Sequence, residues 1–270
     1  AAAACRALGL QAEVRAVQVP GGGRGTGAGG PEAAARDVRH RALDDAARDF
    51  APDAVVLLGH TMDDQAETVL LGLGRGSGAR SLAGMAAATG RLRRPFLHLR
   101  RADTLGACAD LGLTPLVDPT NEPDGTWRRA DGGPLRRSAL RHAALPALEE
   151  ALGPGVVPAL ARTADQLRRD ADLLDALARD VLAEVTRAGD GTSLSLDAAG
   201  LEAAHPAMRS RVVREAIMGL ADRGVRGALA ARHIAAVEAL ISDYHGQGTV
   251  HLPGRLTARR RGATLVIAKE

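Results

Sequence analysis

The chain has 270 residues, of which 46% are hydrophobic and 25% are charged, as in a globular protein with a buried core. Aromatic residues make up only 1%, so the core is expected to consist mainly of Ala, Leu and Val. The formal net charge of +3 is compatible with a polyanionic partner, although a coding bias toward Arg, Ala and Gly explains the same charge.

Cysteine usage and hydropathy narrow the class further. Cys5 and Cys108 are far apart and form no CxxC motif, so a disulfide scaffold, a zinc site and an iron–sulfur site all lack support. No apolar run has the length of a membrane span, and no signal peptide opens the chain. The sequence therefore predicts a cytoplasmic protein without a membrane partner.

The first part of the chain alternates predicted helices and strands, which is typical of an α/β fold with a parallel sheet. Between two of these elements, residues 20–30 are rich in glycine but lack both the G-x-x-x-x-G-K-[ST] pattern and any lysine, so we interpret them as an insertion. Helices are predicted over 1–8, 31–50, 63–73 and 101–111, and strands over 14–19, 53–58 and 95–99.

The pattern changes after about Leu116. Residues 118–134 are rich in Pro, Gly, Asp and Asn and predict a linker, and residues 135–240 are nearly all helical in pattern. Residues 249–269 predict short strands with turns at Pro253-Gly254 and Arg261-Gly262. The predicted domains are a partial Rossmann-like α/β domain over 1–117, the linker over 118–134, and a mostly helical domain with a β tail over 135–270.

Chemically active side chains are densest between residues 60 and 68, where a predicted strand ends and a helix begins, the edge at which α/β sheets bind ligands. His60, Asp63, Asp64 and Glu67 have the spacing of one helical face. Paired carboxylates there suit either Mg²⁺ or a cationic amine. Acids in a first helical turn also complement the helix dipole, and Asp64 with Glu67 could form a cap, so a structural role stays open.

Arginine-bearing segments elsewhere suit polyanions. Arg75-Gly76-Ser77-Gly78 predicts either a phosphate-binding turn or an ordinary glycine C-cap, and Arg36 lies on the helix before the apolar strand, facing either phosphate or solvent. Around the linker, arginines accompany the only tryptophan, a combination that suits a phosphate backbone and a stacked base; a solvated helix face is the alternative. These residues are Trp127, Arg128, Arg129, Arg136, Arg137, Arg141 and His142.

The run HTMDDQAETVLL at 60–71, followed by RGSG at 75–78 and LAGM at 82–85, closely resembles the signature of the tRNA(Ile)-lysidine synthetases, a family of the PP-loop ATP-pyrophosphatase superfamily. The resemblance extends in order over nearly the whole chain. Further matching segments are the arginines at 36 and 39, RPFL at 94–97, DPTNE at 118–122, LRH at 140–142 and LPG at 252–254.

The resemblance implies an ATP-dependent carbon–nitrogen ligase. In this family ATP adenylates the C2 oxygen of the wobble cytidine in the CAU anticodon of tRNA(Ile), and the ε-amine of free L-lysine then displaces AMP. ATP and Mg²⁺ are the implied cofactors, and a homodimer is left open. The implied roles are catalysis for Asp63, Asp64 and Glu67, metal binding for Asp63 and Asp64, nucleotide binding for His60, Gln65, Arg36, Arg75, Gly76 and Ser77, and RNA binding for Trp127, Arg128, Arg129, Arg137, Arg141 and His142.

Two departures from the family pattern qualify these expectations. The family's opening strand and its SGGxDS phosphate loop have no counterpart, so the chain is expected to begin on the second helix of the fold and to bind ATP weakly. The run RSALRH at 137–142 stands where RNRIRH is typical. Two alternatives stay open: another PP-loop enzyme such as a tRNA thiolase, and an RNA-binding fragment without catalytic activity.

Overall fold

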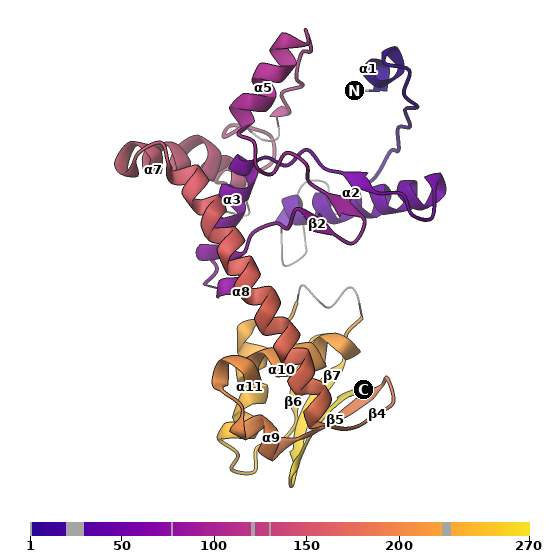
Figure 1. The fold of residues 1–270 in the computed structure, drawn as a ribbon, viewed down its shortest axis with the longest axis vertical. Coiled ribbons are helices and arrows are strands. Elements are labelled where there is room, and N and C mark those ends of the chain that lie inside the picture. Colours follow the sequence, from indigo (N-terminus) through magenta and orange to yellow (C-terminus); the bar gives the residue numbers. More distant parts are fainter. Residues whose placement is uncertain (1, 20–29, 77, 120–121, 130, 223–227) are drawn as a thin grey trace. The chain divides into compact units, whose positions relative to one another are not determined.

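The computed structural model describes residues 2–19, 30–76, 78–119, 122–129, 131–222 and 228–270, with the backbone alone at 30–33. Two compact units comprise Ala1–Asp165 and Gln166–Glu270, and the division falls within the helix α8 (Val156–Val185) (Figure 1). Composition placed a linker at 118–134, whereas the structure groups the helices that follow it, up to Asp165, with the first unit. Among the described residues, no helix combines the length and the hydropathy that crossing a bilayer requires.

The first unit combines helices with a small sheet, in which β1 pairs in parallel with β3 and β2 pairs antiparallel with β3. A helix separates the parallel strands in sequence, which confirms the predicted α/β class. The strands are β1 (Val56–Leu57), β2 (Ala88–Thr89) and β3 (Leu92–Arg93). The helices are α1 (Ala2–Ala7), α2 (Gly30–Phe50), α3 (Met62–Leu73), α4 (Ala79–Leu82), α5 (Arg101–Asp110), α6 (Arg136–Ala139), the π-helix η2 (Leu140–Ala144) and α7 (Leu145–Leu152).

The strand predictions for this unit were largely wrong. Residues 14–19 form no strand, and the run 53–58 is reduced to β1. β1 lies at the edge of the sheet with only β3 beside it, so Leu57 is 67% exposed instead of buried. Residues 95–98 form a turn after β3 because Pro95 has no N–H to donate to a ladder.

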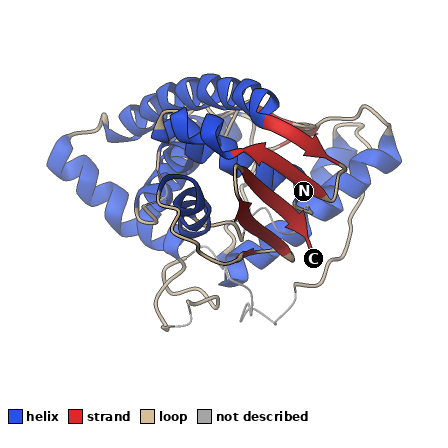
Figure 2. Ribbon diagram, turned by 90° about the horizontal axis from the view of Figure 1, so that it is seen from below, coloured by secondary structure: helices blue, strands red, loops and turns tan. Residues whose placement is uncertain are grey.

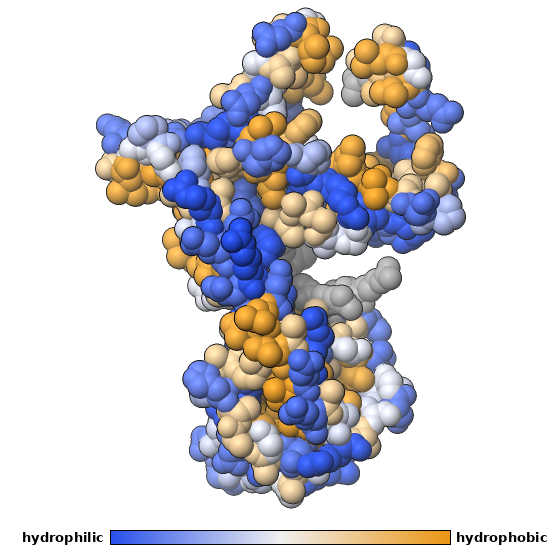
Figure 3. Space-filling model, in the orientation of Figure 1, coloured by the Kyte–Doolittle hydropathy of each residue, from blue (hydrophilic) through white to orange (hydrophobic). Residues whose placement is uncertain are grey.

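The core of the first unit is centred on α3. Ala66 of α3 packs with Leu145 of α7 and Val157 of α8 in one buried cluster. In contrast, α5 contributes no buried side chain, and Leu8 and Leu105 are exposed, in agreement with the hydrophobic surface over α1 and α5 in Figure 3. The helix that carries the predicted site is therefore the best-anchored element of this unit.

The second unit is an antiparallel sheet in the order β4-β5-β8-β7-β6, whose strands lie side by side in Figure 2. The predicted β tail is confirmed, with turns at Pro253-Gly254 and Gly262, but the β4–β5 hairpin was not predicted. The strands are β4 (Thr186–Gly189), β5 (Ser193–Asp197), β6 (Val250–Leu252), β7 (Leu256–Arg261) and β8 (Thr264–Lys269), and the helices are α9 (Ala198–Ala203), α10 (Pro206–Leu220) and α11 (Ala231–Ser242).

Alternation along the strands builds the core of the second unit. Leu256 and Ala258 of β7, and Leu265 and Ile267 of β8, are buried, whereas the residues between them are only partly buried. These side chains share one cluster with the buried faces of α10 and α11. Each fully buried Leu or Ile contributes about 1.5–3 kcal/mol, so the sheet face and the helices packed on it together stabilise this unit.

Candidate active site

The N-terminus of α3 is fixed by a capping box. Thr61, which is buried, is the N-cap, and its backbone N–H and hydroxyl donate to Oδ2 of Asp64 at 2.7 and 2.9 Å. The Asp64 N–H donates in return to the Thr61 hydroxyl oxygen at 3.5 Å. The structural role considered for Asp64 is thus present, but its partner is Thr61 and not Glu67, so only Oδ1 of Asp64 is left for another group.

Asp63, Asp64 and Glu67 face a set of arginines, and together with Glu149 they form what we call the carboxylate–arginine cluster. Nη2 of Arg101 lies 2.8 Å from Oδ1 of Asp64, and Nε of Arg141 lies 2.8 Å from Oε1 of Glu67. Four carboxylates therefore balance four guanidinium groups. The members are Asp63, Asp64 and Glu67 of α3, Arg100 and Arg101 at the start of α5, Arg137 of α6, Arg141 of η2 and Glu149 of α7.

Burial increases the energetic importance of these ion pairs. The Glu67 side chain is 0% exposed, and a buried carboxylate is tolerated only with paired charges and hydrogen bonds. Burial acts to raise the pKa of Asp63, but hydrogen bonds from the Arg100 side chain and the Arg101 backbone outweigh it and hold that pKa below its usual value. Burial likewise opposes the charge of Arg141, yet the bond to Glu67 raises the pKa of its guanidinium. Asp63 and Arg141 are consequently charged at neutral pH.

The sequence interpretation missed Arg100, Arg101 and Glu149. A signal was present for the two arginines, because they follow the next apolar segment along the chain, and adjacent parallel strands end at the same edge of a sheet. The backbone N–H of Arg101 also donates to Oδ2 of Asp63 at 2.7 Å, so the start of α5 is joined to the start of α3.

As arranged, Asp63 and Asp64 do not fit a magnesium ion. Both oxygens of each carboxylate already accept hydrogen bonds, from Arg100 and Arg101 on Asp63, and from Thr61, Arg101 and Arg141 on Asp64. Among the residues that the structure describes, no group of three or more His, Cys, Asp or Glu side chains is disposed to hold a metal. The metal role predicted for this pair would require guanidinium groups to leave.

His60 lies beside the cluster in a basic environment. Its burial, together with the charges of Arg94, Arg39 and Arg36, outweighs the attraction of Asp64 and lowers its pKa to about 4. Burial and the same three arginines also lower the pKa of His40. The structure therefore brings His60 and Arg36, both predicted to bind nucleotide, into one positively charged region, to which Arg94 adds a charge that the sequence interpretation missed. Such a region suits phosphate.

The pKa of His60 predicts a pH dependence of stability. The free energy of unfolding should fall as pH decreases from about 6.5 toward about 4, because the unfolded chain takes up the proton before folded His60 does. Urea titrations across this interval should show a smaller decrease for His60→Gln, which has no proton to take up. Identical pH profiles for the two proteins would contradict the assignment.

Gln65 has a different role from the one predicted. Its side chain is buried, and its amide donates to the Met85 carbonyl at 2.9 Å and accepts from the Met85 N–H at 2.7 Å. Neighbouring Gly84 has a φ of +58°, and a Cβ there would lie 2.6 Å from Oε1 of Gln65. Gln65 therefore joins α3 to the Gly84-Met85 turn, and both ends of its amide are used within the fold. The nucleotide-binding role predicted for Gln65 stays a prediction.

The predicted phosphate turn lies away from the cluster. Arg75 is exposed and donates to the Ser81 hydroxyl at 3.4 Å, and Gly76 has a φ of +62°. Asp64 and Leu73 are nine residues apart on α3, which corresponds to about 13 Å along the helix axis. The acids lie at the N-terminal end of α3, whereas Arg75 follows its C-terminal end. Ser77 lies outside the described residues.

The residues predicted to bind RNA fall into two groups. Arg137 and Arg141, one turn apart, face the carboxylates of α3, as described above. The others surround the linker: Arg128 donates to the Pro123 carbonyl at 2.7 Å, Arg129 pairs with Asp131 at 2.8 Å, and exposed His142 lies 3.9 Å from Glu122. Trp127 is half-buried in the same segment.

Comparison with known families agrees with this architecture. The PP-loop domain model matches residues 1–148, and the TilS substrate binding domain model matches residues 196–266. These matches define an ATP-using PP-loop protein with a separate substrate-binding domain, in agreement with the α/β unit and the sheet-containing second unit.

Similarity to individual proteins identifies the family within this class. The chain is 50% identical over 265 residues to the tRNA(Ile)-lysidine synthase of Leifsonia xyli, covering 97% of this chain and 74% of that protein. It is 53% identical over 244 residues to that of Streptomyces coelicolor (89% and 64%) and 47% identical over 244 residues to that of Thermobifida fusca (90% and 70%). The chain belongs to the tRNA(Ile)-lysidine synthase family, which confirms the resemblance found in the sequence.

Proposed function

We propose that this protein is an ATP-dependent ligase that joins L-lysine to the wobble cytidine in the CAU anticodon of tRNA(Ile). Family membership supports the reaction. The observation that carries the site is the carboxylate–arginine cluster, which lies where α3 begins after a strand of a parallel pair. Ligands of open α/β sheets bind at this edge.

The proposed reaction has two steps. The C2 oxygen of the cytidine attacks the α-phosphorus of ATP, and pyrophosphate leaves. The deprotonated ε-amine of lysine then attacks C2, and the bond from C2 to the adenylated oxygen breaks with release of AMP. The first step develops negative charge on phosphate, which the basic region around His60, Arg36 and Arg94 is suited to stabilise.

The carboxylates of the cluster are proposed to bind the amine. A lysine ammonium carries the same charge as the guanidinium groups that contact Asp63, Asp64 and Glu67, so it can replace one of them without leaving an unpaired buried charge. A carboxylate in contact with that ammonium is placed to accept its proton before attack. Because the cluster as arranged does not fit magnesium, no step is assigned to a metal at these residues.

RNA binding is the proposed role of the arginines around the linker and of α6. Arg128, Arg129 and His142 are suited to phosphate contacts. Arg137 and Arg141 are suited to a second arrangement in which an RNA phosphate replaces a carboxylate as their partner, which would open the acids to lysine. A homodimer is a separate proposal, which a sedimentation measurement of the protein in solution tests.

A direct assay tests the function. The protein expressed from its complete reading frame is expected to transfer labelled lysine to a tRNA(Ile) transcript with a CAU anticodon, with release of AMP and pyrophosphate. The matched control is the same transcript with guanosine at the wobble position, which should accept none. Sulfur transfer would instead indicate a thiolase, and RNA binding without lysine transfer would indicate an inactive binding module. Cys5 and Cys108, both free, give the thiolase no support.

A further inference from the structure

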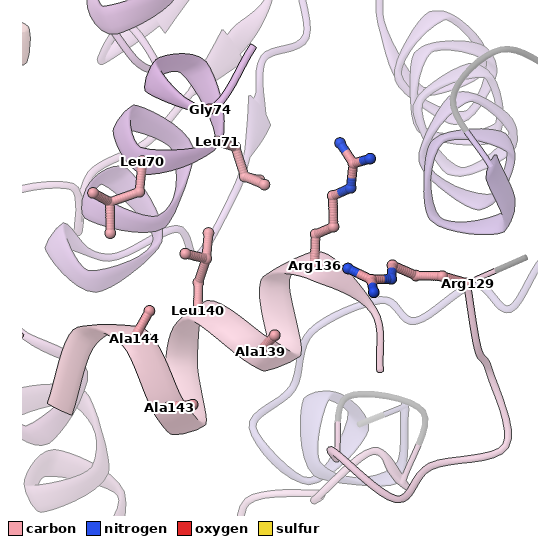
Figure 4. A pocket seen from close by; sticks show the side chains of 9 residues that line it. All are labelled: Leu70, Leu71, Gly74, Arg129, Arg136, Ala139, Leu140, Ala143 and Ala144. Carbon is pink, nitrogen blue, oxygen red and sulfur yellow. The ribbon is translucent and has the colours of Figure 1, made fainter. Parts of the chain in front are cut away.

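An open surface depression of about 600 Å³, which we call the cavity, lies on the first unit between the second half of α3 and the α6–η2 helix (Figure 4). Its walls are mainly aliphatic, and two arginines lie at one end. A volume of this size is in the range of small-ligand sites. The lining residues are Leu70, Leu71 and Gly74 from the α3 side, Arg136, Ala139, Leu140, Ala143 and Ala144 from α6 and η2, and Arg129.

The lining combines two kinds of surface that match two parts of a nucleotide. Leucine and alanine side chains offer a flat apolar face, on which an unstacked base can lie. Arg136 is exposed and forms no ion pair among the described residues, so its guanidinium is available to a phosphate. Arg129 is held at 2.8 Å by Asp131 and adds positive charge at the same end of the cavity.

The cavity and the carboxylate–arginine cluster share the same two helices. Leu70 and Leu71 follow Glu67 by three and four residues, about 4.5 and 6 Å along α3. On the facing helix, Arg137 and Arg141 contact the carboxylates, whereas Arg136 and Leu140 line the cavity. The η2 part of the facing helix, Leu140–Ala144, is a π-helix, a conformation frequently found at functional sites.

We propose that this cavity binds the unstacked base of a nucleotide that neighbours the target cytidine, with its phosphate on Arg136. The inference rests on the proposed function, because it takes the carboxylate–arginine cluster as the position of the lysine that attacks the target base. Trp127 does not line the cavity, so the proposed stacking surface for this base is the aliphatic wall of α3 and η2. The RNA contact predicted for Trp127 is a separate prediction.

Binding measurements on the complete protein, without ATP or lysine, test the assignment. The probes are anticodon stem-loop RNAs, either intact or abasic at the 5′ or the 3′ neighbour of the target cytidine. Arg136→Ala, which removes the phosphate contact, and Ala143→Glu, which places a negative charge in the cavity at an exposed position, should each raise Kd about tenfold. Arg41→Ala on α2 is the charge-matched control and should change Kd less than about twofold. Within the described part of the chain, the Arg41 guanidinium donates to one carbonyl, that of Asp37 on its own helix.

The test depends on whether the effects of the protein substitution and of the abasic RNA on Kd are independent. If the base occupies the cavity, the unmodified protein should bind one of the two abasic RNAs as weakly as Ala143→Glu binds the intact RNA. The Kd of Ala143→Glu for that abasic RNA should then be little higher than either value. Additive losses with both abasic RNAs, or an unchanged Kd for Ala143→Glu, would overturn the proposal. Additive losses with normal lysine transfer would leave the proposed function intact, whereas coupling without lysine transfer would leave the base site intact and refute the function.

Discussion

Replacing Glu67 by Gln is expected to lower the free energy of unfolding by about 2–4 kcal/mol. The carboxylate is 0% exposed and lies 2.8 Å from Arg141 and 3.5 Å from Arg137, whose side chains are 29% and 24% exposed. A neutral amide leaves both guanidinium groups, and that of Arg101 at 3.4 Å, without this charged partner. Because the arginine side chains are partly exposed to solvent, the decrease in the free energy of unfolding should be smaller than for a fully buried pair. Urea denaturation of the two proteins measures the difference.

Glu149→Gln is the matched control for this prediction. Glu149 is 32% exposed and pairs with Arg100, which is 34% exposed, so solvent screens the interaction and its loss should amount to less than about 1 kcal/mol. Equal destabilisation by the two substitutions would show that burial of Glu67 does not set the strength of the cluster.

Asp64→Asn is expected to reduce kcat/KM for lysine by about 100-fold or more, a loss typical of removing a group that handles a proton. The amide oxygen can still accept the hydrogen bonds of Thr61, so the cap of α3 should survive. Loss of the ion pairs with Arg101 and Arg141 should lower the free energy of unfolding by about 1–3 kcal/mol, so activity is measured where the variant is folded. The charge that pairs with Arg101 and would meet the lysine ammonium is lost. Steady-state assays with a saturating tRNA concentration measure the effect.

Thr61→Ala separates chemistry from capping. It removes the cap hydroxyl, at a cost of about 1 kcal/mol, but leaves the Asp64 charge in place. Lysine transfer should therefore persist at a temperature where the variant is folded. If both variants lose activity to the same extent, Asp64 acts only by holding the N-terminus of α3.

Local patterns predicted the elements around the site well, and contacts between distant segments less well. A helix over 63–73 was predicted after an apolar run, and the structure has α3 at Met62–Leu73, with Asp63, Asp64 and Glu67 on it. His60 precedes the N-cap Thr61 and so lies outside the helical face that its spacing suggested. The arginines that neutralise these acids come from segments 37 and 74 residues away in sequence. No local periodicity encodes such pairs, so Arg100 and Arg101 were missed.

The arginines on α6 and η2 show how burial decides between two partners. Residues 137 and 141 have the spacing of one helical face, which suits either RNA phosphate or a carboxylate. The sequence favoured RNA because the segment is arginine-rich. Glu67 has no exposed surface, and in the structure its need for paired charge is satisfied by these two side chains together with Arg101.

The unpredicted hairpin of the second unit has a similar explanation. Residues 135–240 are rich in Ala and Leu, and this composition favoured helix throughout. Between β4 and β5, however, Gly189-Asp190-Gly191 is a turn signal, and Asp190 accepts hydrogen bonds from the N–H groups of Thr192 and Ser193 at 2.9 and 2.7 Å. The edge position of β1 likewise depends on sheet order, which no single segment contains.

The most direct test of the central claim is an experimental structure of the complete protein with L-lysine and a non-hydrolysable ATP analogue. The lysine ammonium is expected within hydrogen-bond distance of Asp63, Asp64 or Glu67, with at least one of the guanidinium groups of Arg100, Arg101, Arg137 and Arg141 displaced from its carboxylate. Lysine bound elsewhere, with all of these ion pairs intact, would contradict the assignment and leave the cluster a purely structural feature of the fold.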